Sequence, residues 1–142
     1  MRSSLVALLT ALVVLVSAGC NSKGYTKAEK RKYLREVKGY HLRFSRHYPK
    51  PSTSLGDLID PALFLKTHEG TALEQKYQVG IVLQECEVAL IAFRGATISD
   101  SKTADFGFDP DTYKEELATS KQRFKESLGR LSDKIAVMER AD

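Results

Sequence analysis

The last third of the chain carries the pattern that most restricts the fold. Five apolar residues recur at intervals of four, three, four and three, at positions Phe124, Leu128, Leu131, Ile135 and Met138. This heptad spacing places them on one seam of an α-helix, which extends back through Tyr113 and Leu117. Because the repeat is short, we expect the partner helix within the same chain; an intermolecular coiled coil is the alternative. Asp109 and Pro110 are typical of an N-cap and first helical residue, and the helix should end near Glu139.

Two capping boxes predict two further helices. In Thr26-Lys27-Ala28-Glu29 and in Thr71-Ala72-Leu73-Glu74, a Thr precedes a Glu by three residues, so the two side chains can satisfy each other's free amides. The first helix should run from about Lys27 to Tyr48 and end before Pro49, with residues 49–54 as a linker. Its apolar stripe is predicted to comprise Leu34, Val37, His41, Phe44 and Tyr48.

The second capping box predicts a helix from Thr71 to about Ile98. A strand hairpin is the alternative because β-branched residues are frequent, but positions 84 and 85 offer neither Gly nor Asn for its turn. The helix is apolar on two faces. One face comprises Val79, Val82, Leu83, Cys86, Leu90 and Phe93, and the other comprises Tyr77, Ile81, Val88 and Ile91. Such a helix either lies at the centre of its bundle or presents a docking face.

Shorter elements are expected between these helices. Residues 55–67 should form a helical connection, capped by Ser54 or by Asp60 with Pro61, in which five residues pack as a lid: Leu58, Ile59, Leu63, Phe64 and Leu65. Residues 99–107 are polar and are predicted to form a loop. The predicted fold class is all-α, a small antiparallel helical bundle of three long helices plus a short helical connection.

The beginning of the chain predicts export. Residues 5–16 are apolar except for Thr10 and follow Arg2. This length matches the hydrophobic region of a signal peptide and falls short of the about 20 residues that span a bilayer. A buried core helix is the alternative, although the segment has no polar face. We expect residues 1–19 to be a signal peptide that is removed, residues 20–25 to be a tether, and residues 26–142 to be one helical domain.

The residues at the end of this segment, Val16-Ser17-Ala18-Gly19-Cys20, resemble the lipobox of bacterial lipoproteins, although Ser17 departs from the Leu favoured at its position. The resemblance is confined to residues 1–20. It implies that Cys20 is the lipid attachment site, carrying a diacylglycerol and an N-acyl chain such as palmitate, and that the protein is held to a membrane. Asn21, where an Asp would favour the inner membrane, implies the outer membrane facing the periplasm. Cleavage that leaves a free Cys20 is the alternative.

Charge divides the mature chain into two parts. Residues 20–50 contain ten Lys or Arg and two Glu, a balance of 10 − 2 = +8, whereas residues 51–142 contain eleven basic and sixteen acidic residues, 11 − 16 = −5. The basic segment either packs beside acidic helices or contacts anionic lipid or an acidic partner. The residues predicted to make such a contact are Lys27, Lys30, Arg31, Lys32, Arg35 and Lys38. Nucleic acid is a poor candidate because the signal exports the chain and no binding motif is present.

No catalytic motif is evident in the sequence. The three histidines, His41, His47 and His68, have no metal-ligand spacing, and a nominal triad of Ser45, His47 and Asp57 has no specificity in a chain of this length. Cys86 lies between two Glu residues on an apolar face, so a buried inert thiol is predicted, with an intermolecular disulfide as the alternative. We therefore predict no catalytic residues, no metal and no cofactor.

Two classes of function remain open. The favoured one is a non-enzymatic envelope lipoprotein that binds, or assists the assembly of, another envelope protein. The alternative is a small enzyme or ligand-binding lipoprotein acting on cell wall or lipid. An open apolar groove beside the helix at residues 71–98 would favour the first class, and a cleft containing a histidine would favour the second.

Overall fold

The computed structural model describes residues 24–106 and 110–140, and every regular element within these ranges is helical. The all-α prediction is therefore confirmed. Three helices are long: α2 (Lys27–Ser45), α5 (Val79–Phe106) and α6 (Pro110–Arg140). Three short elements connect α2 to α5: η1 (Leu55–Asp57), α3 (Ala62–His68) and α4 (Ala72–Tyr77).

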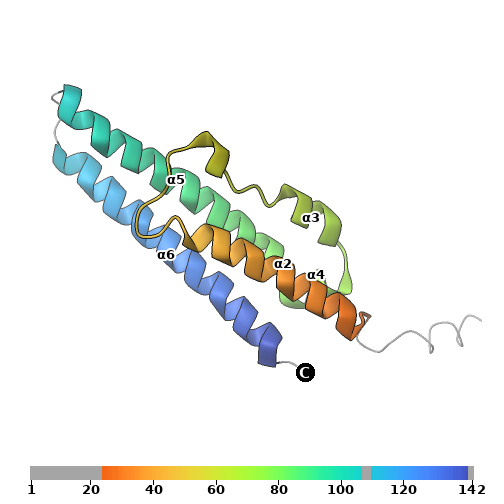
Figure 1. The fold of residues 1–142 in the computed structure, drawn as a ribbon. Coiled ribbons are helices and arrows are strands. Elements are labelled where there is room, and N and C mark those ends of the chain that lie inside the picture. Colours follow the sequence, from red (N-terminus) through yellow and green to blue (C-terminus); the bar gives the residue numbers. More distant parts are fainter. Residues whose placement is uncertain (1–23, 107–109, 141–142) are drawn as a thin grey trace, which may run out of the picture.

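Helices α5 and α6 pack against each other as an antiparallel hairpin (Figure 1). Glu85 of α5 contacts Arg130 of α6, and further along α5 the ring of Phe93 lies 5.9 Å from that of Phe124. Residue numbers therefore rise along one helix as they fall along the other. The apolar seam of the C-terminal helix thus packs against a helix of the same chain.

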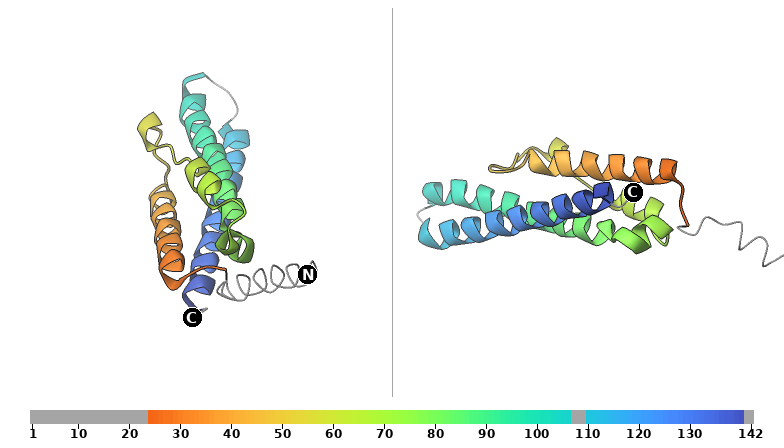
Figure 2. Two further views of the ribbon diagram at one scale, coloured as in Figure 1. Left: turned by 90° about the vertical axis from the view of Figure 1, so that its right-hand side faces the viewer. Right: turned by 90° about the horizontal axis from the view of Figure 1, so that it is seen from below.

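Helix α2 lies along one side of this hairpin (Figure 2). It is antiparallel to α6 but runs in the same direction as α5. Tyr33, early in α2, contacts Glu74 just before α5, and Ser54, beyond the end of α2, contacts Arg94 within α5. The parallel direction is possible because residues 46–78 return the chain to its starting end before α5 begins, so the expected antiparallel order does not hold for this pair.

The core forms where the three long helices meet. From α5 it takes one of the two faces predicted to be apolar, which we call the inner face: Val79, Val82, Leu83, Cys86, Leu90 and Phe93. From α6 it takes Phe124, Leu131 and Met138, spaced by seven residues, with Leu128 and Ile135 half-buried beside them. The prediction for α6 is therefore confirmed from Phe124 onward.

At two positions, the buried residue of α2 is the one directly before the residue that was predicted to be buried. Tyr33 and Tyr40 are buried, whereas Leu34 and His41, the predicted positions, are only half-buried. Both tyrosine rings pack against Phe64 of α3, at centroid distances of 5.4 Å and 5.7 Å. The short helix α3 therefore selects which of two adjacent apolar stripes is covered.

The helix predicted from Thr71 to Ile98 is interrupted at Gln78, whose φ of 51° is left-handed. Thr71 caps α4 as expected, because its hydroxyl accepts from the Glu74 amide at 3.3 Å. The Glu74 carboxylate does not complete the capping box. Its Oε1 accepts from the amide of Gly80 at 2.7 Å, at the beginning of α5, and its Oε2 accepts from the hydroxyl of Tyr33 at 2.6 Å. The contacts with Gly80 and with Tyr33, which is distant in the sequence, therefore take the Glu74 carboxylate away from the capping bond that the local sequence predicts.

Helix α5 continues to Phe106, so the prediction of a polar loop from residue 99 was wrong. No Gly or Pro occurs from Ser99 to Phe106 to stop the helix, and polarity alone does not end one. Asp109 lies outside the described residues, and α6 begins at Pro110 and ends at Arg140, close to the predicted end.

The connection between α2 and α5 is only partly a lid. The Asp60 carboxylate accepts from the amide of Ala62, the first residue of α3, at 2.8 Å, although Pro61 rather than Asp60 occupies the N-cap position. Ile59 and Phe64 are buried, but Leu58 and Leu63, which were expected to pack, are exposed. A helix as short as α3 puts only one side against the rest of the protein, so Phe64 is covered and Leu63 is not, whereas Leu58 lies between η1 and α3.

Candidate functional site: a basic surface at the start of helix α2

The beginning of α2 is fixed by a complete capping box, as predicted. The Glu29 amide donates to Thr26 Oγ1 at 3.1 Å, and the Thr26 amide donates to Glu29 Oε2 at 2.6 Å. This reciprocal pair satisfies two of the free amides of the first turn and fixes the direction in which α2 starts. Cys20, the predicted lipid attachment site, lies outside the described residues.

The two residues before Thr26 belong to the folded domain. Tyr25, predicted to be part of the tether, is buried in the core, and its hydroxyl accepts from Lys76 Nζ at 3.0 Å. Gly24 has a φ of +70°, and a Cβ there would lie 3.0 Å from the Cβ of Ala72 in α4. The described part of the folded domain therefore already includes Gly24, four positions after Cys20.

The six basic residues predicted to contact a membrane or partner differ in exposure. Lys27, Arg31, Lys32, Arg35 and Lys38 are exposed. Lys30 is only 6% exposed and lies on the same side of α2 as Tyr33 and Val37. The exposed surface of this segment therefore carries five of the six cations.

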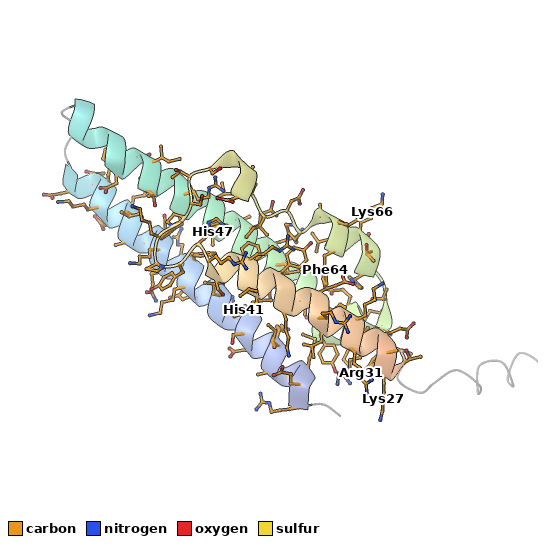
Figure 3. The ribbon with its side chains drawn as sticks, viewed as in Figure 1. Lys27, Arg31, His41, His47, Phe64 and Lys66 are labelled. Atoms are coloured by element: carbon orange, nitrogen blue, oxygen red, sulfur yellow. The ribbon has the colours of Figure 1, made fainter. Side chains whose placement is uncertain are left out.

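Four of the six line one groove. Lys27, Lys30, Arg31 and Lys38 border an opening of about 310 Å³ between α2 and the end of α6. Leu34 and Met138 supply its apolar lining, and Glu139, its one acidic residue, pairs with Lys38. Lys32 and Arg35 are not part of the groove. Figure 3 shows Lys27 and Arg31 at the beginning of α2.

The contribution of α6 to this groove was not predicted from the sequence. Met138 was expected on the seam of its own helix, and Glu139 only as the end of that helix. No local signal places the last turn of α6 beside the first turns of α2. Charge gave no indication either, because residues 110–140 contain seven basic and six acidic residues.

The histidines occupy structural positions. His47 is buried beyond the end of α2, where its Nδ1 accepts from the Ser52 amide at 3.1 Å. Burial and then the positive charge of Arg94 lower the pKa of His47. His68 Nε2 lies 2.9 Å from Glu36 Oε2, and its ring packs against Phe64 at 4.4 Å.

The nominal triad is not assembled. The Ser45 hydroxyl donates to the His41 carbonyl at 2.6 Å, and the Asp57 carboxylate accepts from the Ser52 hydroxyl. His47 does line a cleft of about 340 Å³ together with Arg43, Arg46 and Asp57. Within the two described ranges, no three His, Cys, Asp or Glu side chains gather as metal ligands would.

Cys86 is fully buried on the inner face of α5, as predicted. Burial is the main cause that raises the pKa of its thiol to about 11; the charge of Glu85 adds to the rise, while Ser127 and Arg130 oppose it. A thiol with this pKa is almost entirely protonated near pH 7 and reacts slowly.

A second surface of interest lies on the opposite side of α5 from the core. Ile81, Val88 and Ile91 are 59%, 66% and 56% exposed. Beside Ile81 and Val88, a shallow groove of about 450 Å³ extends to Arg123, Glu126 and Arg130 of α6, and we call this surface the outer face. The predicted second apolar face of this helix is therefore open to solvent except at Tyr77, which belongs to α4 and is buried.

No protein-family model, curated protein or solved structure matches the chain. Among the described helices, none combines the length and the apolar character needed to cross a bilayer.

Proposed function

We propose that this protein is a bacterial envelope lipoprotein, anchored through Cys20 to the periplasmic side of the outer membrane. Its small bundle of three long helices acts by binding or positioning another envelope protein and has no enzymatic activity. The anchor rests on the lipobox resemblance of residues 16–20. Two or three acyl chains on one residue give an attachment that is effectively stable.

One observation carries the orientation of the domain. The basic groove includes Lys27, the first residue of α2, which follows Gly24 by three positions and Cys20 by seven. Four extended residues reach roughly 14 Å, so an anchored domain would hold this groove close to the lipid headgroups. Each exposed Lys or Arg near an anionic surface contributes up to about 1 kcal/mol. The anchor and the basic surface would therefore act together.

Binding, rather than catalysis, is favoured by how the polar groups are used. In the cleft that contains His47, the ring accepts from the Ser52 amide while the Ser52 hydroxyl donates to Asp57. These groups satisfy one another within the fold. The open apolar outer face of α5 is the kind of surface through which a protein contacts another chain, a second copy included.

Metabolic labelling tests the anchor. Cells producing the parent chain should incorporate labelled palmitate into it, and Cys20→Ser should abolish the label and leave unprocessed precursor. Cys86→Ser is the matched control, because it removes the other cysteine and should leave labelling unchanged. Unchanged labelling of Cys20→Ser would overturn the anchor.

Vesicle binding tests the basic surface separately. Protein beginning at Asn21 should bind vesicles containing phosphatidylglycerol at low salt and be released as salt rises. Lys27→Glu with Arg31→Glu should abolish binding. The control, Lys114→Glu with Lys125→Glu, makes the same change in net charge at exposed sites on α6 and should retain it. Equal loss in both variants would show that only net charge matters.

A further inference from the structure

The outer face of α5 is arranged along a single line of residues. Ile81, Val88 and Gly95 follow one another at intervals of seven, so they lie one above another along the helix. They span 95 − 81 = 14 residues, about 21 Å at the rise of an α-helix. Ile81 and Val88 are large and exposed, and Gly95 is exposed with nothing within 4 Å of the position its Cβ would take.

Gly95 has no explanation within the chain. A glycine inside a helix destabilises it by about 1 kcal/mol relative to alanine. Packing does not require it, since a Cβ there would have no described atom within 4 Å, and its φ is not in the left-handed region. A missing side chain on an exposed line of large apolar residues does provide a recess for a side chain from another molecule.

We propose that the outer face is the interface of a homodimer, in which two copies of α5 pack antiparallel about a two-fold axis at Val88. Because 81 + 95 equals twice 88, this axis places Ile81 of each copy opposite Gly95 of the other. A large side chain then meets a recess at both ends of the contact, and the two Val88 side chains meet at its centre.

The charges of α6 fit the same axis. Glu85 pairs with Arg130 at 2.8 Å, and Phe93 lies beside Phe124, so position 88 of α5 lies level with about position 128 of α6. Glu126 and Arg130 stand two residues on either side of that level, and both line the groove. The two-fold axis therefore brings Glu126 of each copy opposite Arg130 of the other, which makes the rim self-complementary.

Cross-linking tests this register in the full chain, produced in cells and exposed to a mild oxidant. Val88→Cys should give a disulfide-linked dimer, because the two copies of residue 88 meet on the axis. The control is Leu42→Cys, an equally exposed apolar position on α2, which should not exceed the background of the parent chain with Cys20 and Cys86. Equal yields from Val88→Cys and Leu42→Cys would overturn the proposal, as would a Val88→Cys link to a different protein instead of a second copy.

A mixing experiment tests the antiparallel direction. The axis places Gln84 opposite Ala92 of the other copy, since 84 + 92 also equals twice 88. Gln84→Cys and Ala92→Cys should each cross-link poorly alone, because like positions are about 12 Å apart along the helix. They should cross-link when produced together. Efficient cross-linking of either one alone would contradict this register.

Filling the recess separates dimerisation from folding. Gly95→Leu in the Val88→Cys chain should reduce the dimer yield at least several-fold, because the added side chain occupies the place of Ile81. It should not lower the melting temperature, since leucine favours the helix, the position is exposed, and a Cβ there has no described atom within 4 Å. An undiminished dimer yield would overturn the packing of Ile81 on Gly95.

Discussion

The inner and outer faces of α5 are both apolar, yet the protein uses them differently. Val79, Leu83 and Cys86 on the inner face are fully buried, whereas Ile81 and Val88 on the outer face are more than half exposed. Hydrophobicity does not separate the two faces. What separates them is that α2 and α6 cover one side of the helix, so its neighbours decide which apolar residues form the core.

The largest expected effect is the difference in stability between a truncation on the inner face and one on the outer face. Phe93→Ala on the inner face should lower the free energy of unfolding by about 3–5 kcal/mol, because it removes a buried ring packed on Phe124. Ile91→Ala on the outer face should change it by about 0.5 kcal/mol or less. Urea denaturation at low protein concentration measures both values, and similar losses would mean that the outer face is covered within the monomer.

A smaller effect is expected where α2 meets the start of α5. Tyr33→Phe removes the hydroxyl that donates to Glu74, and we expect a loss of about 1.5–3 kcal/mol because the acceptor is charged. Tyr40→Phe is the control, because the contacts of Tyr40 with Phe64 and Arg43 are made by its ring. Equal losses in urea denaturation would show that the hydroxyl bond to Glu74 adds nothing specific.

Replacing each of two glycines of α5 by alanine should change the free energy of unfolding in opposite directions. Gly80→Ala should lower the free energy of unfolding by about 1–2 kcal/mol, because the new Cβ would lie 2.7 Å from Leu65 Cδ2 and 2.8 Å from the Glu74 carboxylate. Gly95→Ala should raise it by up to about 1 kcal/mol, since nothing opposes the added methyl. Thermal melts of both variants test the prediction, and a shift of the same sign in both would refute it.

The smallest expected effect is a pH dependence at the far end of α2. The pKa of His47 is lowered by burial and by Arg94, so the unfolded chain binds its proton more readily than the folded protein does. The contribution of His47 to stability is thus present above its unfolded pKa of about 6.5 and is lost as the pH falls below that value. His47→Gln should flatten the decline in stability between pH 7.5 and pH 5. Identical slopes for the variant and the parent would show that His47 does not contribute to it.

Local signals in the sequence predicted a large part of the fold. Both threonine caps form, the Asp60 carboxylate accepts from the first amide of α3, and α6 starts at its proline. These features depend on residues within one turn of each other, and local chemistry is sufficient for them. The loop predicted from residue 99 was wrong because the prediction rested on polar composition alone. No Gly or Pro is present there to end the helix.

The candidate site was predictable only in outline. The cations of α2 were evident from composition, but the burial of Lys30 depends on the side of α2 that packs. Met138 and Glu139, which complete the basic groove, come from a helix about a hundred residues later in the chain. The spacing of Ile81, Val88 and Gly95 is visible in the sequence, yet it has meaning only once this line of α5 is known to be exposed.

The sequence by itself determined that the chain forms helices, where most of them begin, and that α5 is apolar on two faces. The tertiary structure decided the buried stripe of α2, the break at Gln78, the parallel direction of α2 and α5, and the exposure of the outer face. Caps and periodicity act over a few residues, so they are encoded locally. The other features depend on contacts such as that between Tyr33 and Glu74, which lie 41 residues apart and exist only after the chain has folded.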